Sequence, residues 1–370
     1  MAHASADTVI RQDADRRQQS RVCFENLQAY ARNRLDAAIA YPKERLLRRD
    51  FRMARLDMTI WFSSEELADL CARTLMRRKH DDPSAARIEV YAIDAGSGGW
   101  EPPALWRENG GFAPRDFDRI LDAVNLRGFY HVAPSWQFYD RATANGVATF
   151  PGPMDIPPWE SGSPFRLFLH WAYAAAKMRL THAATLGLAG YGALIVGASG
   201  SGKSSTALAG FLNGLDSVGD DYVLVEQGPR VFAHSVFTVF KQDREGLRRA
   251  GVARSEVDSA ELNWHGKVEF EAAKLSPKGL ADRIEIGAVL IPEVARLRRT
   301  SIEPATSRQA ALSLAPSGVF QLPGDATEGF GFLAGLVRRL PAFRVRLSEN
   351  SAEIADAIGS FLAREQRNAG

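Results

Sequence analysis

The chain has 370 residues, more than one typical hydrophobic core supports, so two domains are expected. A formal net charge of +2 with 24% charged residues is too mild to indicate a nucleic-acid partner. Two cysteines exclude a disulfide framework. With no secretory leader and no apolar run of about 18 residues, the sequence favours a cytoplasmic protein without a membrane partner.

The first part of the chain predicts a polar tail followed by a smaller α+β domain. Residues 1–20 carry few large apolar side chains, which is typical of a disordered tail, and the domain would cover 21–160. Alternating polarity over Arg55–Phe62 predicts a half-buried strand, and Ser63 with Glu66 resembles a capping box at the start of a helix. Further strands are predicted at Ile88–Ile93, Trp136–Tyr139 and Gly146–Phe150, the last two as a hairpin.

A proline-rich segment at 151–158 marks the boundary, because prolines do not fit a helix interior or a central strand. The second domain would cover 161–370. It is predicted to open with an apolar helix from Phe165 to about Leu180. The later strands are expected at Ala184–Leu188, Ala193–Val196, Val223–Glu226, Val231–Ala233, Ile286–Ile291 and Phe343–Leu347. The strand at Ile286–Ile291 is expected to end at Pro292. A final helix is predicted to start at Asn350, with Glu353 completing a capping box.

A complete G-x-x-x-x-G-K-S phosphate loop follows the apolar strand before residue 197. Glycines let backbone N–H groups converge on an anion, and a helix predicted over Ser204–Leu212 adds its positive dipole end. Lys203 would reach the β- and γ-phosphates, and the Ser204 hydroxyl would bind Mg²⁺. The nucleotide-binding residues are therefore predicted to be Gly197, Ala198, Ser199, Gly200, Ser201, Gly202, Lys203, Ser204 and Ser205.

Three polar residues lie at short sequence distances from this loop. His182 precedes Gly197, and Asp220 and Asp221 follow Lys203 at the start of a predicted strand. Carboxylates at a strand end beside a phosphate loop can hold Mg²⁺ or accept a proton from an attacking hydroxyl. Taken alone, Gly-Asp-Asp could be a turn and His182 a buried core residue.

The joint spacing of histidine, loop lysine and aspartate pair resembles the catalytic core of the HPr kinase/phosphorylase family. The resemblance covers roughly residues 180–226. It implies an α/β fold with a mixed sheet around a phosphate-loop core, shared with phosphoenolpyruvate carboxykinases. ATP and Mg²⁺ would be the cofactors, and the partner would be a protein or peptide with an acceptor serine. Because relatives often form hexamers, the resemblance also implies a possible homo-oligomer.

The same resemblance implies roles for individual residues. Asp220 would be the base that deprotonates the acceptor serine, with His182 beside it orienting Asp220 or tuning its pKa. Asp221 and Ser204 would hold Mg²⁺, and Lys203 would bind the phosphates. The chain lacks the Glu-Ile-Arg-Gly-like signature that accompanies phosphorolysis, and its first domain differs from the family's usual one. It is more similar to divergent bacterial relatives, some of which act on ribosomally made peptides, so a forward kinase is expected.

Two other functions remain open from the sequence: a small-molecule kinase on the same core, and a nucleotide-sensing module without turnover. A transporter-type ATPase is disfavoured because its LSGGQ-like signature and Asp-Glu strand are absent from the sequence. Lys241, Lys267 and Lys274 could each supply a second cation for the phosphates, and no spacing rule selects one of them. The cation-rich stretch between Arg32 and Lys79 could dock an acidic peptide or form a solvated face of ion pairs.

Overall fold

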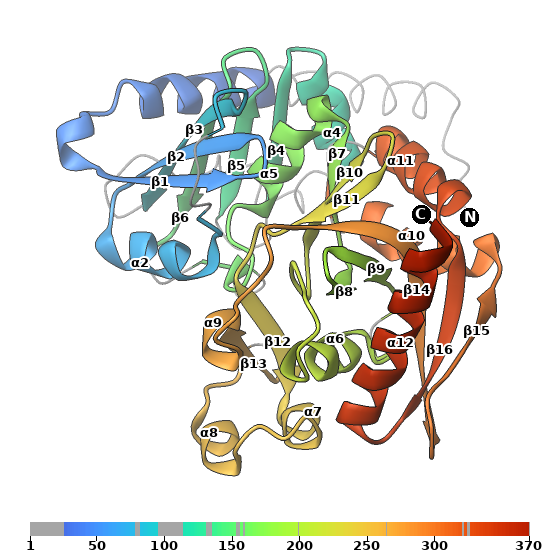
Figure 1. The fold of residues 1–370 in the computed structure, drawn as a ribbon. Coiled ribbons are helices and arrows are strands. Elements are labelled where there is room, and N and C mark those ends of the chain that lie inside the picture. The colour runs from blue at the N-terminus through green and yellow to red at the C-terminus, as the bar shows by residue number, and fades with distance from the viewer. Residues whose placement is uncertain are drawn as a thin grey trace, which may run out of the picture.

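The structure, a computed structural model, describes residues 26–77, 82–94, 114–130, 135–152, 156–157, 160–198, 200–263, 265–319, 322–323 and 326–369. The predicted tail at 1–20 and the loop residue Ser199 lie outside this part of the chain. No described helix is long and apolar enough to cross a membrane. The elements belong to an α/β fold with mixed sheets, as predicted (Figure 1).

The first half of the chain forms a six-stranded sheet of order β1-β2-β3-β6-β5-β4. Strands β2, β3 and β6 run parallel, and the other neighbours are antiparallel. Its elements are a helix over 26–39, η1 (Lys43–Arg45), β1 (Leu47–Met53), β2 (Leu56–Phe62), α2 (Glu65–Thr74), β3 (Ala86–Asp94), α4 (Pro114–Asp122), β4 (Leu126–Tyr130), β5 (Trp136–Asp140) and β6 (Asn145–Phe150).

The second half builds an eight-stranded sheet and a two-stranded ribbon of β12 and β13. Its elements are α5 (Arg166–Tyr173), η4 (Ala174–Ala176), β7 (Met178–Thr181), β8 (Ala184–Leu188), β9 (Tyr191–Ile195), α6 (Lys203–Leu212), β10 (Val223–Gln227), β11 (Val231–His234), β12 (Val239–Asp243), α7 (Arg244–Arg249), α8 (Arg254–Ser259), β13 (Lys267–Glu271), α9 (Ala272–Leu275), β14 (Arg283–Leu297), β15 (Ser301–Ala305), α10 (Ser307–Val319), α11 (Ala326–Arg339), β16 (Ala342–Ser348) and α12 (Ser351–Ala369).

Strand β9 is buried on both faces of the eight-stranded sheet. Ala193 and Ile195 pack with α6 and α12 on one face, whereas Leu194 and Val196 pack with α10 and α11 on the other (Figure 1). β9 runs parallel to β14, which in turn runs parallel to β16. The carboxyl ends of these three strands therefore meet at one edge, which is where ligands bind in such sheets.

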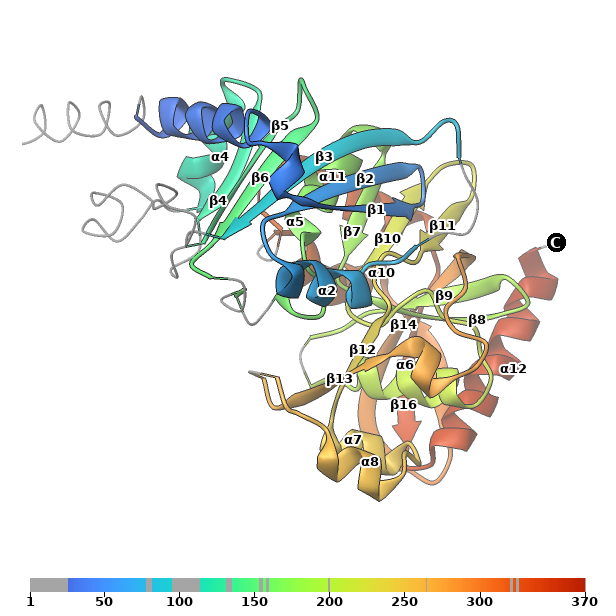
Figure 2. The same ribbon diagram turned by 90° about the vertical axis from the view of Figure 1, so that its left-hand side faces the viewer.

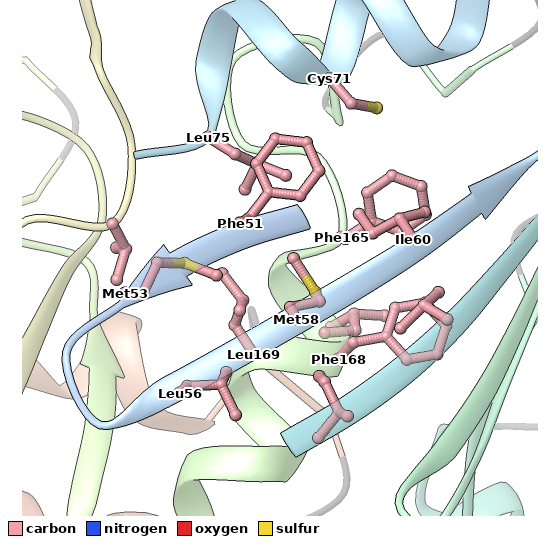
Figure 3. Close-up of a cluster of buried hydrophobic side chains, with 14 of the residues drawn as sticks. Phe51, Met53, Leu56, Met58, Ile60, Cys71, Leu75, Phe165, Phe168 and Leu169 are labelled. Atoms are coloured by element: carbon pink, nitrogen blue, oxygen red, sulfur yellow. The ribbon is translucent and has the colours of Figure 1, made fainter. Parts of the chain in front are cut away.

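One buried cluster joins the two halves of the molecule. Cys71 of α2, Phe168 of α5, and the adjacent cap residues Leu75 and Phe165 face strands β1 and β2 (Figure 3). The same cluster includes Leu224 of β10, from the second half. The six-stranded sheet consequently lies against the phosphate-loop half (Figure 2). The division at residue 160 remains a prediction, and the cluster contains residues from both sides of it.

The predicted apolar helix from Phe165 to Leu180 is wrong in its second half. Helix α5 and its 3-10 extension end at Ala176, and Lys177 turns the chain with φ 55°. Met178–Thr181 then forms β7, which pairs with β10. All four residues of this strand are buried. Sequence periodicity alone does not distinguish a short buried strand from the end of a buried helix, which is why the sequence predicts a helix that continues to Leu180.

Strand β14 also departs from its predicted end, because it continues through Pro292 to Leu297. The carbonyl of Leu290 accepts a hydrogen bond from the Val196 N–H, on the side of β14 that faces β9. Backbone groups two residues apart on a strand point to the same side, so the backbone nitrogen of Pro292 also faces the β9 side. β9 has already ended there, so the missing proline N–H breaks no ladder bond. On the other side Pro292 stays paired with Val345 of β16.

The two predicted helix caps are confirmed only in part. Ser64, rather than Ser63, caps α2 by accepting from Leu67 N, and Ser63 instead bonds Asp94 on β3. Asn350 caps α12, since its Oδ1 accepts from Glu353 N at 3.1 Å. The Glu353 carboxylate does not complete a box, because it accepts from Thr300 and Ser348.

We expect Gly192→Ala to destabilise the fold by about 1–3 kcal/mol because the β8–β9 hairpin leaves no room for a side chain. A Cβ at Gly192 would lie 2.9 Å from Gly187 Cα and against the Leu186 carbonyl oxygen, both backbone atoms that cannot move alone. Urea unfolding measures the change. Gly331→Ala in α11 is the control, since nothing lies within 4 Å of its Cβ position. An unchanged midpoint for Gly192→Ala would contradict this account of the hairpin.

Candidate active site

The segment predicted to be a phosphate loop lies between β9 and α6, so the predicted order of strand, loop and helix is confirmed. Gly200 and Gly202 have φ of 81° and 97°, in the region that other residues rarely adopt. A Cβ at Gly202 would lie 2.8 Å from Leu347 Cδ1. Glycine at this position therefore lets the loop turn tightly against the end of β16. The amides of the first helical turn lack partners within the helix and can bind an anion.

Lys203, the first residue of α6, is a buried cation without a hydrogen-bond partner in the described part of the chain. Lys203 is 7% exposed, and its Nζ atom makes no hydrogen bond with any described residue. Burial lowers the pKa of Lys203, while the charges of Asp221 and Asp220 act to raise it. Burying an ammonium group without a hydrogen-bond partner lowers the stability of the fold, and a bound ligand that accepts its hydrogen bonds would remove this cost. The orphaned Nζ fits a phosphate oxygen.

Asp220 is the more deeply buried of the two carboxylates, with 1% of the residue exposed. Its Oδ2 atom accepts from the Lys241 backbone N–H at 3.1 Å, and Oδ1 has no hydrogen-bond partner among the described residues. Burial and the neighbouring charge of Asp221 raise its pKa. Asp220 therefore has a raised proton affinity and a free acceptor atom, the two properties that a general base needs.

Asp221 is held by two partners instead. His182 Nε2 lies 3.1 Å from Oδ1, and Lys241 Nζ donates to Oδ2 at 2.9 Å. Burial alone would raise the pKa of Asp221, but Lys241 and His182 lower it well below its usual range. The two adjacent carboxylates thus have pKa values shifted in opposite directions by their environments. His182 contacts Asp221 directly.

These side chains belong to a closed ring of contacts that begins and ends in the segment after the proline-rich boundary. The Tyr222 ring lies 5.4 Å from the His182 ring and 5.7 Å from the Arg166 guanidinium. Arg166 pairs with buried Glu160 at 3.4 Å. On the other side Lys241 lies 4.0 Å from Glu269, which accepts from Ser161 at 2.9 Å. Segment 160–166 therefore contacts the site directly.

Of the three candidate cations, Lys241 joins the site through a side-chain ion pair. Its side chain is 14% exposed and comes from β12, opposite Glu269 of β13. Lys267 lies near enough for its charge to act on both Lys203 and Asp220. Lys274 pairs with Glu271 at 2.7 Å and is 71% exposed. Sequence reasoning also missed Glu269, Arg166 and Glu160. Arg166 and Glu160 are close in sequence, but Arg166 reaches the site through Tyr222 and Glu269 through Lys241, and both of these contacts join distant segments.

We expect Lys241→Met to lower the free energy of unfolding by roughly 1–3 kcal/mol. This is less than the loss expected on breaking a fully buried ion pair, because the Asp221 side chain is 26% exposed and solvent screens its charge. The methionine leaves the Asp221 carboxylate without its ammonium partner in a largely buried site. Urea unfolding provides the measurement, with Lys274→Met as the exposed control. Equal stability of the two variants would show that the Lys241–Asp221 pair contributes nothing.

The remaining predicted site residues lie in and beside the loop. Ser204 is half-buried in the first turn of α6, and Ser205 Oγ accepts from Gln242 Nε2 at 2.8 Å. No group of three or more His, Cys, Asp or Glu side chains within the described ranges could hold a metal. Mg²⁺ commonly needs only one or two protein ligands beside substrate phosphates. The predicted pair of Ser204 and Asp221 would supply that number of ligands, and a metal on Asp221 would compete with Lys241.

The cation-rich stretch of the first half forms ion pairs in several places. On edge strand β1, Arg48 pairs with Asp50 at 3.1 Å. Lys43 pairs with Glu89 at 3.2 Å, and Arg55 with Glu226 at 3.2 Å. Charges on an edge strand also oppose pairing with another sheet. These contacts favour the solvated-face interpretation of the stretch for the residues described.

Comparison with known proteins gives little beyond this geometry. No protein-family model matches the chain, and no curated protein matches it. Among solved structures, the HPr(Ser) kinase/phosphatase from Coxiella burnetii is similar over 52% of this chain and 97% of its own. The identity is 16% and the TM-score 0.27. A functional proposal therefore depends on the site itself.

Proposed function

We propose that this chain is an ATP-dependent kinase, similar in its core to HPr kinases, that phosphorylates a serine hydroxyl of a protein or peptide. The observation that carries the proposal is the orphaned Lys203 ammonium together with two adjacent carboxylates in different environments: Asp220 has an oxygen without a partner, and Asp221 is held by His182 and Lys241. A phosphate loop alone would support nucleotide binding. The buried, partly unpartnered Asp220 supports turnover, because a nucleotide sensor needs no base.

In this proposal the loop amides and Lys203 bind the phosphates of ATP, and Ser204 and Asp221 hold Mg²⁺. When bound, Mg²⁺ neutralises charge on the phosphate oxygens. His182 and Lys241 fix the orientation of the Asp221 carboxylate through its two oxygens. Because phosphoryl transfer needs little covalent help, such positioning and charge neutralisation would supply most of the acceleration.

Asp220 acts as the base. The serine oxygen forms a bond to the γ-phosphorus while the bond from that phosphorus to the β,γ-bridging oxygen breaks, and ADP leaves with that electron pair. The serine proton passes to the Asp220 carboxylate, whose Oδ1 atom is available to accept it. The raised pKa of Asp220 favours this transfer.

The test is incubation of the purified chain with γ-labelled ATP and three sets of acceptors: serine-containing peptide libraries, the same libraries with serine replaced by alanine, and small alcohols. We expect label on serine peptides only. Label that appears only on small alcohols would instead establish a small-molecule kinase. ATP binding without transfer to any acceptor or to water would support a sensor and contradict the proposal.

A further inference from the structure

A pocket of about 400 Å³ lies directly beside the phosphate loop. Gly202 and Ser205, from the loop end and the first turn of α6, line its inner side. Its remaining walls come from α7, the end of β14 and the junction of β16 with α12. Ligand pockets in proteins commonly have this size. The pocket thus continues from the place where the phosphates would lie.

Apolar surface is exposed in this pocket. Val294 is 57% exposed, and its Cγ2 atom lies 3.3 Å from the position of a Cβ at Gly202. Leu347 and Ile354 add apolar side chains from β16 and α12. An exposed valine in contact with a phosphate loop provides a surface on which a flat, apolar group could pack.

Arg296 lines the same pocket from an irregular part of β14. The pairing of β14 with β16 shifts between Val294 and Leu297, and Arg296 has a φ of 49°, in the left-handed region. Such strain in a residue other than glycine is concentrated at functional sites. No hydrogen bond or ion pair joins Arg296 to another described residue. A free guanidinium can stack on a base or bind a ribose or phosphate oxygen.

We propose that this pocket binds the nucleoside half of ATP, with the base against Val294 and Arg296 at its rim. The inference rests on the proposed function, which places the triphosphate in the adjoining loop. A second pocket of about 360 Å³ lies at the β1–β2 turn and β10–β11, and no residue of the phosphate loop lines it. Of these two pockets, the one beside Gly202 adjoins the loop.

The test compares ATP with inorganic tripolyphosphate, which has the phosphates but no nucleoside. Isothermal titration calorimetry in magnesium buffer would measure both affinities for the full chain, for Val294→Asp and for Arg296→Ala. Because both residues are exposed, neither change should disturb folding. Leu312→Asp is the matched control, since Leu312 is 65% exposed and lies outside the pocket.

We expect Val294→Asp to weaken ATP binding about tenfold or more, and Arg296→Ala to weaken it less. Each change should weaken tripolyphosphate binding by a smaller factor than ATP binding, because only the effect of its charge acts on the phosphates alone. Leu312→Asp should change neither affinity. Unchanged ATP binding in both pocket variants, or equal loss of ATP and tripolyphosphate, would overturn the nucleoside assignment while leaving the kinase proposal intact. Failure of the unaltered chain to bind either compound would overturn the proposed function itself.

Discussion

Replacing Lys203 with methionine is expected to weaken ATP binding about 10- to 100-fold, which corresponds to roughly 1.5–3 kcal/mol for a hydrogen bond to a charged group. Phosphoryl transfer should fall further, about 1000-fold, because negative charge develops on the leaving β,γ-bridging oxygen in the transition state. The reason is structural: Lys203 Nζ is buried and makes no hydrogen bond with any described residue, so its interactions are left for a ligand.

Calorimetry with ATP and single-turnover transfer of labelled phosphate measure the two effects separately. Lys274→Met serves as the matched control, because Lys274 is exposed and pairs with Glu271. If Lys203→Met bound ATP as tightly as the unaltered chain, the loop would not be the phosphate site. If binding fell but transfer in the bound complex did not, Lys203 would act in binding alone.

Asp220→Asn is the second change expected to have a large effect. The substitution keeps the shape of the side chain and removes its capacity to accept a proton. We expect transfer to fall about 10²- to 10⁴-fold, the range for loss of a general base. ATP affinity should stay within about threefold of its original value, because no phosphate contact is assigned to Asp220. The Lys241 backbone N–H can still donate to the amide oxygen, so the local structure should be kept.

Asp216→Asn provides the comparison, because Asp216 precedes the aspartate pair by a few residues and its carboxylate pairs with Lys278. This control should leave both transfer and binding unchanged. Transfer at the normal rate by Asp220→Asn would falsify the role of this residue as base. A large loss of ATP affinity in the same variant would instead move Asp220 to the binding of nucleotide or metal.

The sequence predicted the phosphate-loop region well because local signals agree there. An apolar strand, glycines and a following helix stand in succession, and the structure has β9, the loop and α6 in that order. Where both faces of an element are buried, local pattern is ambiguous. Arg166–Tyr173 and Met178–Thr181 are both largely buried, yet the first is a helix and the second a strand. Pairing with β10, a distant segment, decides between them.

In the candidate site too, residues close to the loop in sequence could be predicted, whereas a residue brought in by strand pairing could not. The positions of Asp220 and Asp221 relative to Lys203 are visible in the sequence, and the structure brings their charges together. Lys241 could not be selected in this way. Its approach to Asp221 depends on the ribbon of β12 and β13, which sets Lys241 opposite Glu269. Nothing in the local sequence distinguishes Lys241 from Lys274, which faces solvent.

The most direct test of the central claim is a crystal structure of the chain with Mg²⁺ and a non-hydrolysable ATP analogue. We predict a terminal phosphate oxygen at about 2.7–3.2 Å from Lys203 Nζ. Asp220 Oδ1 should lie about 5–6 Å from the terminal phosphorus, which leaves space for one hydroxyl between them. Phosphates bound away from residues 197–205, or an Asp220 carboxylate directed away from the terminal phosphate, would contradict the account.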